Sequence, residues 1–186
     1  MSTKKGVMEI DIDTGAAILT VVSKKYGAFR VLLDASDYPR VATHKWCVLK
    51  SKKNTLTYFG ANLLMSDGKR KTLLLHRFLM DPPKGLLVDH KDAYDTLDNR
   101  RSNLRIATRE QNNQNKRPRT GTSSQYKGVS WTKLRGKWSA YITKSGRTLP
   151  LGCCDCEMEA AKLYDAAAID LFGEFALLNF PISAVA

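Results

Sequence analysis

Long apolar runs are missing from this chain, and their absence bears on where the protein acts. No apolar run in the 186 residues approaches the roughly 20 residues that cross a bilayer, so no membrane-spanning helix is expected. The start from Met1 to Gly6 is polar and carries lysine, and no apolar core follows it as in a secretory leader. Because 43% of the residues are hydrophobic, a packed core is expected. We therefore expect a soluble, cytoplasmic protein without a membrane partner.

Cysteine is scarce, and its pattern argues against a zinc protein. Of the four cysteines, Cys153, Cys154 and Cys156 form one cluster, and Cys47 is distant from them in sequence. A structural zinc site needs about four ligands at workable spacing. The chain lacks a pair of Cys-x-x-Cys units and has no histidine near the cluster. Reduced thiols, which are typical of cytoplasmic proteins, are the expected state.

Acidic residues are absent from one long stretch of a chain whose formal net charge is +12. Between Gln111 and Cys154 there are nine Lys or Arg residues and no Asp or Glu. From Asp155 onward the balance reverses, with six acidic residues against Lys162. A basic stretch that is localised in this way favours contact with a polyanion, and we expect double-stranded DNA as the partner. No small-molecule cofactor is expected.

The hydrophobic pattern divides the chain into segments of an α+β fold. Residues 1–60 contain short β-type runs at Ala17–Val22, Phe29–Leu33 and Trp46–Leu49, and a small β-rich unit is expected there. Residues 61–115 are expected to form a second unit. Residues 116–125 are a basic linker, and residues 126–182 are expected to form a separate domain.

The second unit is expected to contain two strands and a helix. Leu86–Val88 is a short apolar strand that ends at Asp89-His90, and Leu104–Ala107 is the next strand. Thr108 has the character of an N-cap residue, and Gln111 lies three residues further on, as in a capping box. A helix is therefore expected to begin at this point.

The third unit is expected to contain three strands and one helix. The β-type runs are Lys127–Trp131, Lys137–Thr143 and Arg147–Leu151, with Ser145-Gly146 as the tight turn between the last two. The helix is expected from Met158 to Phe172, and Gly173 suits its C-terminal end. Its apolar face is expected to consist of residues at three- and four-residue steps: Met158, Ala161, Tyr164, Ala168 and Leu171.

Several short patterns in the second unit occur in order at suitable distances, and together they resemble the HNH endonuclease family, specifically its phage and intron homing endonucleases. The patterns are Val88-Asp89-His90, Asp98-Asn99-Arg100, Ser102-Asn103-Leu104-Arg105 and Gln111-Asn112-Asn113, with His76-Arg77 upstream. The resemblance covers most of residues 1–115. It implies a ββα-metal unit, in which two strands and a helix surround one divalent cation.

This resemblance implies two metal ligands. Asp89 would supply a carboxylate and Asn112 a carboxamide oxygen, with Asn113 a rival and Gln111 a weaker rival for the second position. Oxygen ligands suit a hard cation, and the family position often filled by His holds Asn here. One Mg²⁺ or Mn²⁺ is therefore expected rather than zinc.

His90 is the expected general base, because an imidazole titrates near neutral pH and can take the proton of the attacking water. It follows Asp89 directly, so the two side chains need a bend or a strand end to act together. Asn103 matches the central asparagine of the family pattern and is expected to hold the loop and orient His90. His76 and Asn99 are expected to support the loop. The third histidine, at position 44, is expected to be structural.

Patterns in the third unit resemble the plant ethylene-response-factor DNA-binding domain of the Apetala type, over residues 126–181. They include Tyr126-Lys127-Gly128-Val129, Gly136-Lys137-Trp138, Tyr164-Asp165-Ala166-Ala167 and Leu178-Asn179-Phe180-Pro181. The resemblance implies a three-stranded antiparallel sheet packed on one helix, with the sheet in the major groove. Several positions that read bases in the plant pattern hold other residues here: Ser130, Tyr141, Thr143, Thr148 and Pro150. The fold is expected to carry over, but the plant target sequence is not.

The residues expected to contact DNA come from the linker and the sheet, where basic side chains can reach phosphates and base edges. Base contact and core packing both stay open for Trp131 and for Trp138. The complete set of expected contacts is Lys116, Arg117, Arg119, Lys127, Trp131, Lys133, Arg135, Lys137, Lys144 and Arg147.

The sequence thus predicts a site-specific, metal-dependent DNA endonuclease of the homing type. One active-site motif per chain is compatible with nicking by a monomer, and a weak dimer could cut both strands. A non-catalytic transcriptional regulator with a vestigial nuclease unit is the alternative, against which the intact Asp89, His90, Asn103 and Asn112 argue. A structure-selective or RNA nuclease is a third hypothesis, against which the likeness to a duplex-DNA reader argues.

Overall fold

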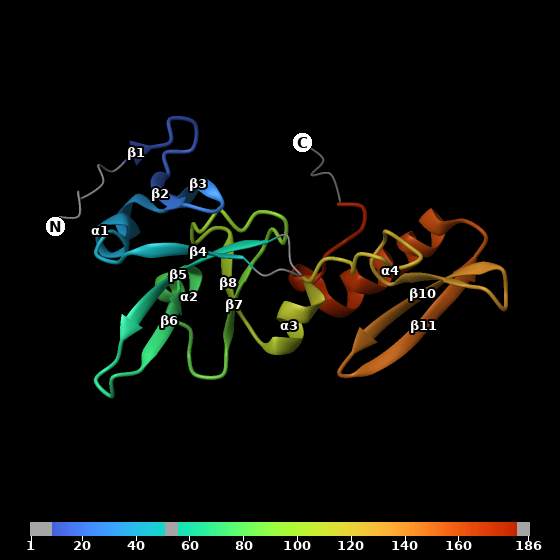
Figure 1. Ribbon diagram of the computed structural model, residues 1–186. Helices are drawn as coiled ribbons and strands as arrows, with labels where there is room; N and C mark the ends of the chain where they lie inside the picture. Colours follow the sequence, from blue (N-terminus) through green and yellow to red (C-terminus); the bar gives the residue numbers. More distant parts are fainter. Residues whose placement is uncertain (1–8, 51–55, 182–186) are drawn as a thin grey trace. The chain divides into compact units, whose positions relative to one another are not determined.

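The computed structural model describes residues 9–50 and 56–181, and the prediction for Met1–Gly6 lies outside these residues. The chain divides into two compact units, Met1–Ala107 and Thr108–Ala186 (Figure 1). Antiparallel sheets and α-helices both contribute to it, which confirms the expected α+β class. Among the described residues, no helix has the length and apolar character needed to cross a membrane.

The first unit contains two antiparallel three-stranded sheets, with the strand orders β1-β2-β3 and β4-β5-β6. The short helices η1 (Ala35–Asp37) and α1 (Tyr38–Val41) lie between the two sheets in sequence. Strands β2, β3 and β4 occupy the three runs expected in residues 1–60. The strands are β1 (Glu9–Ile10), β2 (Ala17–Ser23), β3 (Gly27–Leu33), β4 (Trp46–Lys50), β5 (Thr57–Leu64) and β6 (Arg70–Leu74).

One core serves the whole of this unit. Its fully buried side chains include Val31 and Leu33 from β3, Phe59 from β5 and Leu75 from the following helix. The core therefore draws on residues both before and after the expected division at residues 60 and 61, which falls inside β5. Burial of large aliphatic and aromatic side chains contributes about 1.5–3 kcal/mol each relative to exposure, so this shared core stabilises both segments together.

Helix α2 (Leu75–Met80) and the hairpin of β7 (Leu87–His90) and β8 (Leu104–Ala107) complete the first unit. The polar loop between β7 and β8 is attached to β3 by backbone hydrogen bonds. Leu32 N donates to Leu97 O at 2.9 Å, and Asn99 N donates to Leu32 O at 2.9 Å. Strand β8 coincides with its expected run, and β7 extends to include Asp89 and His90.

The second unit consists of a short helix, a three-stranded antiparallel sheet and a long helix. The sheet has the order β11-β10-β9, and α4 packs against it (Figure 1). The capping box expected at Thr108 is present, with both of its hydrogen bonds. The elements are α3 (Arg109–Gln114), β9 (Val129–Thr132), β10 (Lys137–Lys144), β11 (Arg147–Cys154), α4 (Glu157–Phe172) and η2 (Gly173–Phe175).

Helix α4 buries a narrow stripe, which differs in part from the expected face. Ala160, Ala161 and Ala168 are fully buried, because their small side chains let the helix approach the sheet closely. Met158 was expected on this face but is 52% exposed, so that prediction is wrong. It lies in the first turn at the margin of the stripe, and Phe172 supplies a large buried side chain at the other end.

The closing residues of the second unit tie the start of the sheet to α4. Asp165 on α4 accepts hydrogen bonds from Asn179 N at 2.8 Å and from Phe180 N at 2.8 Å. The Asn179 carboxamide in turn accepts from Lys127 N at 2.7 Å and donates to Lys127 O at 3.1 Å. These contacts give the Tyr-Asp-Ala-Ala and Leu-Asn-Phe-Pro patterns a structural role.

Candidate functional site

Asp89 lies in the middle of a buried ion pair. The register of the β7–β8 hairpin places it opposite Arg105. Asp89 Oδ2 accepts hydrogen bonds from Arg105 Nε at 3.1 Å and from Arg105 Nη2 at 3.0 Å. Both side chains are buried, and a buried charge is tolerated when it is paired and hydrogen-bonded. The Asp89 carboxylate is therefore held in a fixed orientation on the hairpin.

His90 is the last residue of β7 and lies opposite Leu104 of β8. Its Nε2 atom lies 3.3 Å from Asn99 Oδ1. The Asn99 amide nitrogen donates to Thr96 O and Leu97 O at 3.1 and 3.3 Å, which leaves the Asn99 oxygen to face the imidazole. Nε2 must then carry the proton, and the lone pair of the neutral ring is on Nδ1. This tautomer can accept a proton at Nδ1.

Burial lowers the pKa of His90, because the charged imidazolium loses hydration in this site. The hydrogen bond with Asn99 and the nearby Asp89 carboxylate act in the opposite direction without cancelling the effect. The neutral ring is therefore favoured at neutral pH. A neutral imidazole is the form that a general base needs.

Two further rings pack around His90. The centroid of His76 lies 5.4 Å from that of His90, and the centroid of Tyr58 lies 6.2 Å from it. Burial lowers the pKa of His76 to about 3, with smaller contributions from His90 and Arg77. His76 thus stays neutral beside His90. Tyr58 was not predicted from the sequence, because it reaches this group from β5, a strand that the hydrophobic pattern did not indicate.

Asn103 holds the loop between the two hairpin strands. Its side-chain nitrogen donates to Asp95 O at 3.2 Å and to Asp98 O at 2.9 Å, and its oxygen accepts from Asp92 N at 2.9 Å. These bonds join both ends of the loop. Asn99 Oδ1, in turn, lies 3.3 Å from His90 Nε2. Asn103 therefore shapes the loop, while Asn99 orients the imidazole.

Two arginines in the loop form ion pairs that anchor it. Arg100 donates to both oxygens of Asp98, at 2.9 and 2.7 Å. Burial raises the pKa of Asp98, but the hydrogen bonds from Arg100 outweigh this and lower it overall. Arg101 likewise donates hydrogen bonds to both carboxylate oxygens of Asp37, at 3.0 and 3.1 Å. The loop that contains Asn99 and Asn103 is thus held from both sides.

His44 belongs to a separate aromatic group. Its ring lies 4.9 Å from Phe78 and 5.8 Å from Trp46 between centroids, and its Nδ1 lies 2.8 Å from Thr43 Oγ1.

Among the residues that the structure describes, no three His, Cys, Asp or Glu side chains form a group that could hold a metal ion. The expected ligand pair of one carboxylate and one carboxamide is not a group of this kind.

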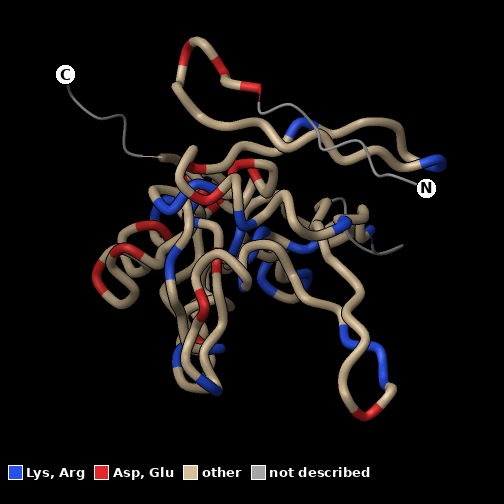
Figure 2. The backbone as a smooth tube through the Cα atoms, turned by 90° about the vertical axis from the view of Figure 1, so that its left-hand side faces the viewer, with Lys and Arg blue, Asp and Glu red and all other residues tan. Residues whose placement is uncertain are grey.

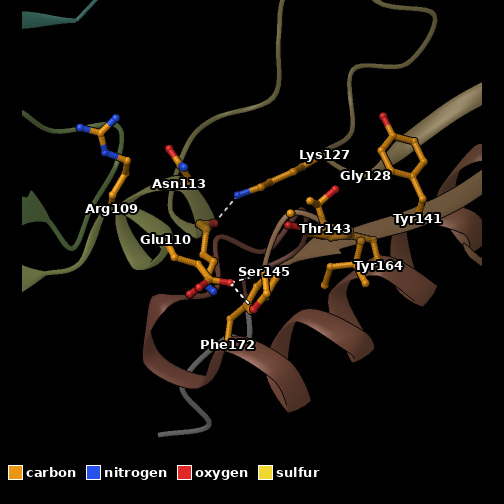
Figure 3. Close-up of a pocket in the computed structure, with 13 residues that line it drawn as sticks. Arg109, Glu110, Asn113, Lys127, Gly128, Tyr141, Thr143, Ser145, Tyr164 and Phe172 are labelled. Carbon is orange, nitrogen blue, oxygen red and sulfur yellow. Dashed lines mark hydrogen bonds between the residues drawn. The ribbon is translucent and has the colours of Figure 1, made fainter. Parts of the chain in front are cut away.

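Helix α3 of the second unit carries the other expected ligand, Asn112. One face of α3 lines a cavity of about 570 Å³ through Arg109, Glu110, Asn113 and Gln114 (Figure 3). Asn112 is not among the lining residues, since successive helix residues are about 100° apart. The Gln111 side-chain oxygen accepts from Thr108 N at 2.8 Å in the capping box. Gln111 is thus engaged in the capping box, while Asn113 faces the cavity.

The face of the sheet that is turned away from α4 is uncharged at its centre. Val129, Ala140 and Ile142 are buried under α4, and residues that alternate with them lie on the opposite face. All five positions at which the plant pattern differs lie on that outer face: Ser130, Tyr141, Thr143, Thr148 and Pro150. Thr132 and Ser139 lie on the same face. Hydroxyl groups are thus common on the face that includes the positions at which the plant pattern reads bases.

Basic residues surround this outer face instead. Lys133 and Arg135 lie in the turn between β9 and β10, and Lys144 and Arg147 flank the turn between β10 and β11. Figure 2 marks the lysines and arginines along the backbone in blue. Lys137 begins β10 and pairs with Asp155 at 3.2 Å.

Two of the residues expected to contact DNA are engaged within the unit. The Lys127 ammonium donates to Gln114 O, at the C-terminal end of α3. Trp131 shares a strand face with the buried Val129 and packs edge-on against Trp138, with ring centroids 5.1 Å apart. The hydrogen bond to Gln114 thus accounts for the position of the Lys127 side chain, and packing on Trp138 accounts for that of Trp131.

Comparison with known proteins gives a match to one family pattern and similarity to three relevant relatives. The pattern of the family described as "HNH endonuclease" matches residues 81–114. An uncharacterized HNH endonuclease of Acanthamoeba polyphaga mimivirus is 31% identical over 95% of this chain and 88% of its own length. Protein 3.8 of Escherichia phage T7 is 35% identical over 50% of this chain and 76% of its own length. An APETALA2-like protein of Oryza sativa subsp. indica is 41% identical over 33% of this chain and 14% of its own length.

Proposed function

Because the chain belongs to the HNH endonuclease family, we propose that it is a site-specific DNA endonuclease of the homing type with His90 as its general base. The observation that carries this proposal is the contact between His90 Nε2 and Asn99 Oδ1. It orients the imidazole, and the neutral ring can take the proton of a water molecule. That transfer generates the hydroxide that attacks the phosphorus atom.

Asp89 and Asn112 are the proposed metal ligands, and the donor set fits a hard cation because both supply oxygen. A bound Mg²⁺ or Mn²⁺ would supply Lewis-acid polarisation of the phosphate and stabilise the leaving oxygen. Asn112 is favoured over its neighbours because Gln111 is used in the capping box and Asn113 lines the cavity. The Arg105 guanidinium holds the Asp89 carboxylate in the orientation proposed for this role.

The second unit is proposed to bind double-stranded DNA through the outer face of its sheet. The similarity to an APETALA2-like protein and the absence of acidic residues between Gln111 and Cys154 support this proposal. The hydroxyl-rich centre of the face would contact base edges, and the surrounding cations would contact phosphates. The proposed phosphate contacts are Lys133, Arg135, Lys144 and Arg147, with Lys116, Arg117 and Arg119 from the linker. One active site per chain makes nicking by a monomer the proposed reaction.

A plasmid assay tests this function. The purified chain is incubated with supercoiled plasmid in Mg²⁺, Mn²⁺ or EDTA, beside the variants His90→Ala and His44→Gln. We expect metal-dependent conversion to relaxed circles, a loss of roughly 100-fold or more in His90→Ala, and retained cleavage in His44→Gln.

Two outcomes would contradict the proposal. Persistent DNA binding without cleavage in either metal would favour a DNA-binding regulator with a vestigial nuclease unit. Equal cleavage by the wild type and His90→Ala would remove His90 as the base. Sequencing of the cut ends tests the homing type, because a site-specific enzyme gives one cleavage position.

A further inference from the structure

The cavity of the second unit lies beside an open edge of its sheet (Figure 3). Strand β9 pairs with β10 only as far as Ala140, whereas β10 continues to Lys144. Among the described residues, no other strand pairs with this edge of β10. Helix α3 lies next to it, since Glu110 Oε1 accepts a hydrogen bond from Ser145 N at 2.7 Å. The volume of about 570 Å³ between α3, the sheet and α4 is within the range of small-ligand sites.

The buried part of the cavity wall is apolar and largely aromatic. Ile142 from β10 and Tyr164 and Phe172 from α4 line the cavity, and all three are buried. The Tyr164 ring is held in place by Gly128, because a Cβ added to this glycine would lie 2.0 Å from Tyr164 Cδ2. Such a wall can pack against a flat ring, as aromatic side chains do with nucleobases.

The exposed part of the wall is polar and basic. Arg109 and Asn113 on α3 are exposed and lie across the cavity from the end of β10 (Figure 3). Among the described residues that line the cavity, Glu110 carries the only carboxylate, and it accepts hydrogen bonds from Ser145 N and Oγ. The cations of Arg109 and Lys127 outweigh this one negative charge. The wall therefore favours a ligand that carries an anionic group.

The cavity is continuous with the proposed DNA-binding face. Tyr141 and Thr143 lie on the outer face of the sheet and also line the cavity. A nucleotide has a flat ring, a polar edge and a phosphate, and the wall offers a partner for each of them. The carboxamide of an asparagine can form two hydrogen bonds with the edge of a base, and a guanidinium binds phosphate strongly.

We propose that the cavity binds one unpaired nucleotide of the DNA that lies on the sheet. This inference rests on the proposed binding of double-stranded DNA by the second unit. The base would pack against Tyr164 and Phe172. Asn113 would contact the polar edge of the base, and Arg109 would contact the phosphate. Proteins that take a base out of the helix bind it by stacking and by hydrogen bonds to its edge, and a base that is already unpaired costs least to bind in this way.

The proposal is tested with the full-length chain and two labelled duplexes of the same sequence, one perfectly paired and one with a single extra adenosine at its centre. Fluorescence anisotropy in EDTA gives the affinity for each duplex without cleavage. Asn113→Trp fills the cavity from an exposed position, and Asn113→Ala removes only the carboxamide. Ala166→Trp, at an exposed position of α4 that does not line the cavity, is the matched control. The melting temperature of each variant is measured beside its affinities.

We expect the wild type to bind the duplex with the extra adenosine roughly tenfold more tightly than the paired duplex, because the unpaired base need not be taken out of the stack. Asn113→Trp should abolish this preference and leave the affinity for the paired duplex and the melting temperature unchanged. Asn113→Ala should reduce the preference, and Ala166→Trp should retain it. With 5-iodouracil as the extra base, photo-crosslinking of the wild type should give an adduct on Tyr141 or Tyr164.

Equal affinity of the wild type for the two duplexes would overturn the proposal. A preference that persists in Asn113→Trp, or a crosslink confined to residues outside the cavity, would also overturn it, because the extra base would then bind elsewhere. Binding of free dAMP without any preference for the extra adenosine would assign the cavity to free nucleotides and reject an unpaired nucleotide of DNA. A wild-type chain that binds neither duplex would instead refute the proposed DNA binding of the second unit.

Discussion

At the scale of single residues, the histidine pair is the most unusual feature of the first unit. His76 and His90 lie edge to face, and burial is the largest cause of the lowered pKa of each ring. Two charged imidazoles at this separation would repel one another. The structure thus keeps both rings neutral, which agrees with the role proposed for His90 and makes the fold sensitive to acid.

The acid sensitivity can be predicted from the pKa of His76, which is lowered to about 3 in the folded chain. The unfolded chain takes up this proton below about pH 6.5, and the folded chain does not, so stability falls as the pH drops through this range. The cost at about pH 5 is on the order of 2 kcal/mol. Urea unfolding of the wild type and His76→Gln at pH 7.5 and pH 5 measures it. The variant should lose less stability between the two conditions. An equal loss would mean that His76 is hydrated in the folded state.

At the scale of elements, the contact between β9 and α4 depends on Gly128. This residue has a φ of 73°, and an added Cβ would lie 2.0 Å from Tyr164 Cδ2 and 2.7 Å from Tyr141 O. Tyr164 is itself buried, and its ring cannot move away without disturbing the packing of α4. Glycine is therefore required here both by the backbone conformation and by the close approach of the helix.

Gly128→Ala should destabilise the second unit by about 2–4 kcal/mol, because backbone strain and overpacking act together. Gly146→Ala is the matched control, since its φ of 76° is similar but nothing lies within 4 Å of an added Cβ. The control should cost about 1 kcal/mol. Thermal unfolding followed by circular dichroism gives the comparison. Equal effects of the two substitutions would show that strain alone matters at Gly128.

Most elements could be predicted from the sequence because their patterns are local. The runs for β2, β3 and β8, the capping box at Thr108 and the end of α4 at Gly173 were all readable from neighbouring residues. Strand β5 was missed because Gly60 and Asn62 interrupt its apolar pattern and both residues disfavour strands. The exposed Met158 was misplaced because periodicity gives the direction of a face but not its width.

The site could be predicted only in part, for a related reason. The Asp89-His90 pair and its asparagines form a sequence pattern, but their partners come from tertiary structure. Arg105 lies within that pattern, yet its ion pair with Asp89 follows from the register of two strands joined by a long loop. Tyr58 reaches His90 from a strand far away in sequence. Pairing and packing of this kind cannot be deduced from local composition.

At the scale of the whole molecule, the distribution of charge matters more than its sum of +12. The basic residues of the second unit surround an uncharged sheet face. The acidic residues of this unit all lie before Gln111 or after Cys154. The first unit also carries cations, for example Lys69, Arg70 and Lys71 on the β5–β6 hairpin. If net charge alone attracted DNA, the two groups of cations would contribute equally to the affinity for DNA. If the sheet is the binding face, the cations around the sheet would contribute more to this affinity than those of the first unit.

Salt dependence separates these possibilities, because each phosphate contact releases about 0.9 counterions when B-DNA is bound. Replacing Lys133, Lys144 and Arg147 with Gln should lower the slope of log affinity against log salt by about 2–3 if each contacts a phosphate. Replacing Lys69, Arg70 and Lys71 with Gln removes the same charge and should leave the slope unchanged. Fluorescence anisotropy with a labelled duplex at several salt concentrations, in EDTA to prevent cleavage, gives both slopes. Equal decreases in the two triple variants would mean that long-range attraction, and not the sheet margin, accounts for binding.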